Sequence, residues 1–372
     1  MNKLNKYAFS DLYDIASGIS TTKTQAGHGT PFVSFSTVFN NIFLPDELPD
    51  LMDTSEQEQE TYSIRKGDIL ITRTSETADE LAMSCVALKD YPGATYSGFV
   101  KRLRPKTIGV AYDKFMAFFL RSKYFRKVIN NNTIMTLRAS FNEDMFSFLT
   151  LCLPDYDVQV AVGDLLYNIE CKIQNNKRIN DNLAQQAQLL FDFMFQDISG
   201  SKHIGDFIVP QRGTALLSKD AIPGDIPVVA GGLVPSTYHN AANTVAPVIT
   251  ISSSGANAGF VNLWGVPVWS SDSSFIDFKM TPYVYFWHAL LKRHQNNIYK
   301  IQTGSAQPHI YPSHIASLPV CDLDFGKVAD YTERVTPLFT LISKNYKESN
   351  QLRALRDWLL PMLMNGQATI SD

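Results

Sequence analysis

The sequence predicts a mixed α/β (α+β) protein in which two similar domains alternate with two long helices. Three observations predict this fold class. A long heptad-like helical pattern occurs twice, the segments before the two patterns match in order, and both copies are rich in short apolar runs separated by turn residues. With 372 residues, of which 45% are hydrophobic, the chain is long enough for two or three domains of about 150 residues each.

The two helical patterns share one seam. Apolar residues recur at spacings of three and four within residues 158–196, and again within residues 324–365. Adding 169 to a residue number in the first helix gives its counterpart, as from Ile173 to Ile342. Both seams turn polar in the middle, at Asn176, Asn180, Asn345 and Ser349. Either helix alone would expose its apolar seam to water, and consecutive copies joined by a domain favour an antiparallel pair, so we expect an antiparallel coiled coil. The polar residues cost stability but fix its register.

The repeat extends back through the segments that precede each helix. The offset between the copies falls from about 195 near the start to 169 near the helix. The matched segments begin at Gly18 and Gly213, and continue as "GDILITRTSE" (67–76) with "APVITISSSG" (246–255), "SGFVKRL" (97–103) with "SSFIDFK" (273–279), and "TLRASFNEDMFSFL" (136–149) with "SAQPHIYPSHIASL" (305–318). We therefore expect two copies of one domain, related by a pseudo-two-fold axis.

The first copy is the longer one. The offset drops most steeply, from 196 to 179, between Pro31 and Ile69. The acidic run 44–60 lies in this interval and is as long as the drop. It is interpreted as a single insertion, exposed and mobile at the surface.

The predicted boundaries are a first domain at 1–155, a spacer helix at 156–201, a second domain at 202–322 and a second spacer helix at 323–372. At about 1.5 Å per residue, residues 158–196 of the first helix would span roughly 58 Å. Such a rod could hold two binding faces at a set distance. Duplex DNA has a matching geometry, because half-sites lie about 34–36 Å apart per helical turn.

Charge is distributed unevenly along a chain whose net charge is −3. Residues 89–138 carry 11 Lys or Arg and two acids, whereas residues 44–80 carry 11 acids and three bases. The basic segment predicts either a face that binds nucleic acid or an ordinary solvated face, and charge alone does not decide between them.

Several classes of protein are not expected. No apolar stretch reaches the ~18 residues that span a bilayer, and no secretion signal opens the sequence, so we expect a cytoplasmic protein. The four cysteines show no CxxC spacing and are interpreted as buried thiols in a reducing compartment.

Catalytic motifs are also missing. His309 and His314 lack a third ligand at metal-binding spacing, Ser253 is not in a GxSxG elbow, and "IDFK" (276–279) has no acidic counterpart in the first copy. No methyltransferase cofactor loop or catalytic tetrad is present. We therefore expect a non-enzymatic chain that needs neither cofactor nor metal.

The duplicated order of domain and long helix resembles the specificity (S) subunit of type I restriction–modification enzymes. The segments that carry the resemblance are "GDILITR", "YFRKVI", "LRASFNEDMF", the closing helix "NQLRALRDWLLPMLMNG" and their second-copy counterparts. The resemblance implies two target recognition domains, each reading half of a bipartite site in double-stranded DNA. It also implies a coiled coil that docks two methyltransferase subunits and, through them, restriction subunits.

Candidate DNA contacts are polar or basic residues in loops that match between the copies. They are Arg73, Thr74, Ser75, Lys101, Arg102, Arg121, Lys123, Arg138 and Ser140 in the first copy, and Ser252, Ser253, Ser254, Asn257, Lys292, Arg293, Lys300, Thr303, Ser305, Gln307 and His309 in the second. Some of these could be ordinary turn residues, and Ser140 could be the N-cap of the following helix, with Glu143 completing a capping box.

A second function remains open at this point. The low net charge is compatible with a non-catalytic scaffold whose two modules bind proteins instead of DNA. Strong salt dependence of duplex DNA binding would discriminate between the two functions.

Overall fold

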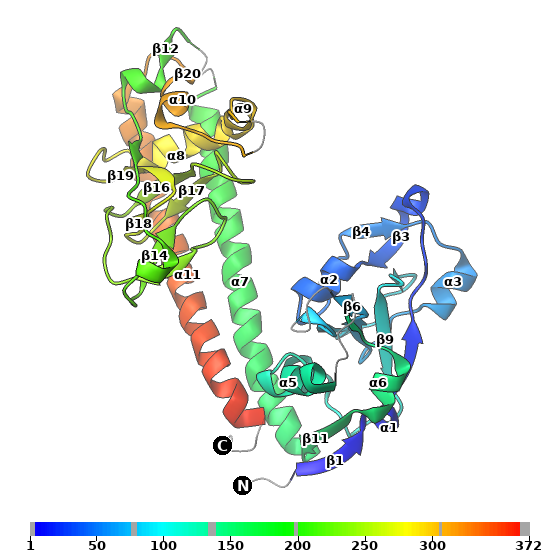
Figure 1. Ribbon diagram of the computed structural model, residues 1–372. Coiled ribbons are helices and arrows are strands. Elements are labelled where there is room, and N and C mark those ends of the chain that lie inside the picture. Colours follow the sequence, from blue (N-terminus) through cyan, green and yellow to red (C-terminus); the bar gives the residue numbers. More distant parts are fainter. Residues whose placement is uncertain (1–3, 76–79, 133–138, 197–199, 305–306, 365–372) are drawn as a thin grey trace. The chain divides into compact units, whose positions relative to one another are not determined.

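The computed structural model (Figure 1) describes residues 4–75, 80–132, 139–196, 200–304 and 307–364. The chain divides into two compact units, residues 1–173 with 351–372, and residues 174–350. Each unit contains one sheet-rich domain and part of both long helices. No helix in the described residues is both long enough and apolar enough to cross a membrane.

The two long helices are α7 (Tyr156–Met194) and α11 (Phe325–Met364). They pair in both units. In the first, Arg356 Nη1 lies 2.7 Å from Glu170 Oε2. In the second, the Tyr331 hydroxyl donates to the Ala187 carbonyl at 3.1 Å. Residue numbers rise along one helix as they fall along the other, so the pair is antiparallel, as predicted.

The polar interruptions of the two seams meet each other within the second unit. Asn176 Nδ2 donates to Ser349 Oγ at 3.2 Å and to Glu348 Oε2 at 2.8 Å. Asn345 Nδ2 donates to Asn180 Oδ1 at 2.9 Å. Asn176 and Ser349 are almost fully buried. These bonds form only in one register, which is the role that the sequence predicted for them.

The first unit holds two main sheets. The four-stranded sheet has the order β2 (Tyr13–Ser17), β9 (Val100–Pro105), β5 (Ile69–Thr72), β7 (Ser84–Val86). The three-stranded sheet has the order β4 (Asp50–Met52), β3 (Ala26–Val33), β8 (Thr95–Tyr96). Two further pairs are β1 (Leu4–Ala8) with β11 (Thr150–Pro154), and β6 (Thr74–Ser75) with β10 (Ala139–Ser140). The short helices are α1 (Phe9–Leu12), α2 (Phe35–Asn40), α3 (Glu56–Thr61), α4 (Asp113–Phe119), α5 (Lys123–Asn132) and α6 (Glu143–Phe148).

The second unit repeats this topology. Its four-stranded sheet has the order β13 (Gln211–Arg212), β19 (Ser273–Asp277), β16 (Val248–Ser252), β17 (Val261–Trp264). Its three-stranded sheet has the order β15 (Thr237–His239), β14 (Ile226–Val229), β18 (Trp269–Ser270). A short pair, β12 (Lys202–His203) with β20 (Pro319–Val320), corresponds to β1 with β11. The shorter helices are α8 (Val284–Arg293), α9 (Gln295–Lys300) and α10 (Pro312–Ala316).

Two glycines show that the sheets of the two units correspond residue by residue. A Cβ on Gly18 would lie 2.1 Å from the Ser97 carbonyl oxygen, and a Cβ on Gly213 would lie 2.4 Å from that of Ser270. Only glycine permits this approach. The two glycines therefore make Ser97 of the first copy equivalent to Ser270 of the second, which is an offset of 173 residues. The offset of 176 from the sequence comparison was therefore wrong, because side-chain similarity does not reveal the strand pairing.

The extra length of the first copy forms two insertions. The stretch between β3 and β4 runs from 34 to 49, whereas that between β14 and β15 runs only from 230 to 236. The stretch between β4 and β5 runs from 53 to 68, and its counterpart runs from 240 to 247. Strand β4 lies inside the acidic run and is shared with the second copy. The prediction of one exposed insertion was wrong, since the added segments form α2 and α3 around a common strand.

Each unit has its own main hydrophobic core. Phe115 and Phe119 of α4 pack with Val162 of α7 in the first unit, and Phe286 of α8 packs with Phe191 of α7 in the second. These contacts place one face of each domain against the long helices. Of the four cysteines expected to be buried, only Cys85 is; the other three are partly exposed.

Removing the central amide should weaken the helix pair. We expect Asn176→Ala to lower the free energy of unfolding by about 1–3 kcal/mol, because the buried Ser349 loses a partner. Asn175 lies one position away on the exposed face of α7, so Asn175→Ala is a matched control and should change stability by less than about 0.5 kcal/mol. Urea unfolding of both variants measures the difference, and equal stabilities would contradict the role of this layer.

Candidate nucleic-acid interface

Two loops that are far apart in sequence join in the first unit. The loop after β5 runs into β6, and this short strand pairs antiparallel with β10, matching Thr74 with Ser140. The Phe141 amide donates to the Arg73 carbonyl at 2.8 Å. Phe141 itself is fully buried, so it anchors this junction to the core and leaves Arg73 and Ser140 exposed.

The second unit builds the same junction. The Ile310 amide donates to the Ser253 carbonyl at 2.9 Å, and the Gly255 amide to the Pro308 carbonyl at 3.1 Å. Ser254 and His309 form an isolated antiparallel bridge. Ile310 is buried like Phe141. The loop that carries the exposed Gln307 is therefore pinned at its base.

The hydrogen bonds set the correspondence between the copies. Ser140 matches His309, as the sequence comparison predicted. Arg73 matches Ser253, one position further than the predicted Ser252. Ser252 belongs to β16, where it pairs with Ser273 and is buried.

The predicted candidates differ widely in exposure. Arg73, Lys123, Ser140, Lys300, Thr303 and Gln307 are exposed, and Thr74, Ser254, Asn257 and His309 are half-buried. Ser75 and Ser253 are buried within the junctions. Arg138 and Ser305 lie outside the described residues.

Two cations of the first copy point into their domain instead of toward solvent. Lys101 Nζ donates to Ser17 Oγ at 3.0 Å and to Glu143 Oε1 at 3.3 Å. Arg102 Nη1 donates to the Ser63 carbonyl at 2.7 Å. Arg102 and Lys101 are less than a tenth exposed. They have structural partners, which the sequence did not predict, and are not suited to phosphate contacts.

Arg121 also has a structural role. It donates to carbonyls at the end of α2, those of Val38 at 2.7 Å, Phe39 at 3.0 Å and Asn41 at 2.7 Å, and to the Ser84 carbonyl at 2.6 Å. Burial lowers the pKa of Arg121. In the second unit, Arg293 similarly donates to carbonyls at the end of α7. Both guanidinium groups complete helix C-termini, where cations are favourable.

Many cations of the basic segment 89–138 have acidic partners in the first unit. Five of its cations lie within 3.5 Å of acids from other parts of the unit: Lys89 with Asp46, Lys101 with Glu143, Arg104 with Asp68, Lys106 with Asp14, and Lys114 with Asp164. Five of the 11 cations of this segment therefore offset acids of the same unit.

The alternative role of Ser140 as the N-cap of α6 is contradicted by the structure. Asn142 occupies this position, and its side chain accepts a hydrogen bond from the Met145 amide at 2.8 Å. Ser140 pairs in β10 and remains exposed. It is therefore available at the junction, whereas a capping residue would be occupied.

Arg212 and Asp272 are site residues that the sequence analysis missed. Arg212 Nη2 donates to Asp272 Oδ1 at 2.9 Å, and Ser254 Oγ donates to the other oxygen of Asp272. Arg212 is thereby held beside the junction. Arg212 directly precedes the matched segment that starts at Gly213, so extending that match by one position would have found it. Asp272 could not be found in this way, because the offset assigned to its segment was wrong.

The first unit has different residues at these two positions. Strand pairing places Ser17 where Arg212 stands, and Phe99 where Asp272 stands. The amides of Arg73 and Ser253 donate to the carbonyls of Phe99 and Asp272, at 2.8 and 3.1 Å. Phe99 is 62% exposed. The two units thus present an aromatic ring and an ion pair on the same backbone.

Comparison with known proteins gives a consistent result for the fold. The type I restriction–modification S subunit from M. genitalium superposes with a TM-score of 0.61, covering 100% of this chain and 97% of that one at 16% identity. The chain has the fold of a type I specificity subunit. This confirms the fold class predicted from the sequence.

Sequence similarity to such specificity subunits is partial. The specificity subunit of the type I restriction enzyme HindI from Haemophilus influenzae is 26% identical over 170 residues, which cover 45% of this chain and 35% of that protein. The HsdS subunit from Thermoanaerobacter tengcongensis has a TM-score of 0.39 at 12% identity, covering 98% of this chain and 97% of that one. No protein-family profile matches the sequence.

Replacing the structural Arg121 and the exposed Arg73 by alanine should have different effects on stability. We expect Arg121→Ala to lower the free energy of unfolding by about 3 kcal/mol, because it leaves several carbonyls of α2 without a donor. Arg73→Ala should change it by less than about 0.5 kcal/mol. Thermal and urea unfolding measure both, and a stable Arg121→Ala variant would show that α2 does not depend on this cap.

Proposed function

We propose that this chain is the DNA-reading specificity subunit of a type I restriction–modification complex and has no catalytic activity of its own. Residues 1–155 and 202–322 are the two target recognition domains, and each reads one half of a bipartite site in double-stranded DNA. The helical segments 156–201 and 323–372 form the spacer between them.

One observation carries this proposal. Both units tie the same two loops together by the same backbone hydrogen bonds, yet the side chains on these loops differ. Such a design suits recognition of two different sequences by one scaffold, since base edges are read by side chains on projecting elements. The exposed residues of these loops include Arg73, Ser140 and Gln307, and such polar groups suit base edges and phosphates.

The proposed contacts in the second domain are Arg212, Ser254, Thr303 and Gln307. An arginine held by a carboxylate suits the two acceptors of guanine in the major groove, and a glutamine suits adenine. In the first domain they are Arg73, Thr74, Phe99 and Ser140. Contacts to the phosphates and sugars of the DNA backbone are proposed for Lys123, Asn257, Lys300 and His309.

The decisive test is sequencing of methylated DNA from a host that carries this chain with its methyltransferase. We expect a bipartite motif, one half of which changes when residues 1–155 are exchanged for those of another specificity subunit. Arg212→Ala and Gln307→Ala should relax sequence specificity only in the half of the motif that is read by residues 202–322. A motif that ignores the exchange would overturn the proposal, and salt-independent DNA binding would favour the protein scaffold.

We also propose that the long helices dock two methyltransferase subunits, through which restriction subunits join. Each helix exposes a large apolar side chain at the matching position, offset by 169. Leu189 of α7 is 60% exposed and Trp358 of α11 is 64% exposed. Exposed apolar residues at equivalent positions on both helices favour two equivalent docking surfaces for one kind of partner.

Each apolar residue should control one docking event. We expect Leu189→Asp and Trp358→Asp each to reduce the number of bound methyltransferase subunits from two to one, and the double variant to bind none. Native mass spectrometry of the purified complex counts the subunits. Thr336 is neutral and exposed on α11, so Thr336→Asp controls for the one added negative charge. Full binding by the double variant would place the docking surface elsewhere.

A further inference from the structure

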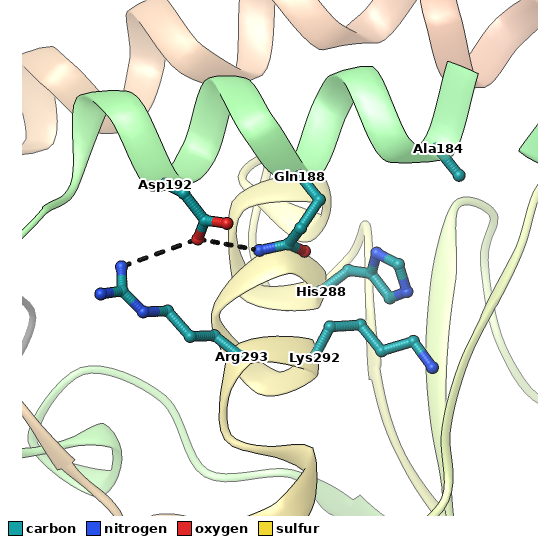
Figure 2. Close-up of a pocket in the computed structure, with 6 residues that line it drawn as sticks. All are labelled: Ala184, Gln188, Asp192, His288, Lys292 and Arg293. Carbon is teal, nitrogen blue, oxygen red and sulfur yellow. Dashed lines mark hydrogen bonds and ion pairs between the residues drawn. The ribbon is translucent and has the colours of Figure 1, made fainter. Parts of the chain in front are cut away.

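A pocket of about 410 Å³ lies in the second unit between α7 and α8 (Figure 2). Its volume falls in the range of about 300–1,000 Å³ that is common for ligand sites. The residues that line it are Ala184, Gln188, Asp192, His288, Lys292 and Arg293.

The charges in the pocket do not balance. Asp192 is engaged by Gln188 Nε2 at 3.3 Å and by Arg293 Nη1 at 3.7 Å. Lys292 Nζ lies over the ring of Phe260 at 4.7 Å, but it has no ion pair or hydrogen bond within the described part of the chain. One ammonium group is therefore left without a counter-ion.

Lys292 and His288 lie one turn apart on α8, and Figure 2 shows both side chains on the side of the pocket beneath Ala184. Burial, together with the charge of Lys292, lowers the pKa of His288 to about 3. Burial also lowers the pKa of Lys292. A neutral imidazole, which can donate one hydrogen bond, thus stands beside a partly desolvated cation.

In the first copy, the cation at the position equivalent to Lys292 has oxygen partners. The counterpart of Lys292, at an offset of 171, is Arg121, whose guanidinium binds the carbonyls at the end of α2. Helix α2 belongs to the first of the two insertions. The described residues 230–236 between β14 and β15 contain no helix. The second copy therefore keeps the cation but lacks the chain segment that supplies its oxygen partners.

We propose that this pocket binds a carboxylate, with Lys292 as its ion-pair partner and His288 as a hydrogen-bond donor. The group replaces the oxygens that α2 supplies in the first copy. It comes either from a small free carboxylate or from an acidic side chain of a protein that docks against α7. The residues that line the pocket are not among the DNA contacts proposed above, so the site does not depend on the proposed reading of DNA.

The first arm of the test uses the full chain and small carboxylates. Acetate and succinate are titrated against chloride at constant ionic strength, while NMR of labelled histidine follows the His288 ring. We expect a saturable shift whose apparent affinity falls about tenfold or more in Lys292→Met. Lys292→Arg should retain binding. Ala184→Leu should block the mouth without changing charge, and Lys279→Met, an exposed lysine elsewhere in the unit, should have no effect.

The second arm measures binding of the methyltransferase subunit to the same variants. If Lys292→Met and Ala184→Leu weaken this binding while acetate gives no shift, the carboxylate is an acidic side chain of the partner. If acetate or succinate binds and the partner is unaffected, the ligand is a small free carboxylate. The absence of any Lys292-dependent effect in both arms would overturn the proposal, whether or not the chain directs methylation.

Discussion

The fold depends on the register between α7 and α11, because each unit is completed by helical residues that are distant in sequence. Leu363 and Met364, near the end of the chain, lie in the same buried cluster as Val162 of the first unit. Phe191 and Tyr331 share the core of the second unit, with ring centroids 5.6 Å apart. A slip of one turn, about 5.4 Å, would remove residues from both cores. The buried amide layer opposes such a slip, since its hydrogen bonds exist in one register only.

Comparison of the two units shows which backbone features are shared and which exposed side chains differ. The sheet orders, the glycine contacts and the hydrogen bond that ties the two loops occur in both units. The exposed residues at the junction do not, since Phe99 and Ser17 stand where Asp272 and Arg212 form an ion pair. Because main-chain bonds hold the loops, the exposed side chains can change without loss of the fold. This freedom is what a scaffold for two different targets requires.

The sequence could predict the helices and the repeat because their signals are local. Heptad spacing marks each helix, and the polar interruptions mark the register, so Asn176, Asn180, Asn345 and Ser349 were found together. The partners of cations could not be predicted in this way. Arg121 serves a helix that is distant in sequence, and only the tertiary structure brings them together. For the same reason, the extra length of the first copy was assigned to one segment, although it forms two insertions on either side of a shared strand.

If the chain reads DNA as proposed, the composition of its loops determines how affinity and specificity are divided. Most cations of the basic segment neutralise acids or bind carbonyls within the first unit, and hydroxyl and amide groups dominate the junctions. Such groups suit base edges, whereas nonspecific affinity comes mainly from lysine and arginine near phosphates. A reading subunit of this kind gains specificity from its loops and little affinity from charge. A net charge of −3 is then compatible with DNA recognition, because the remaining phosphate contacts would fall to the partner subunits of the proposed complex.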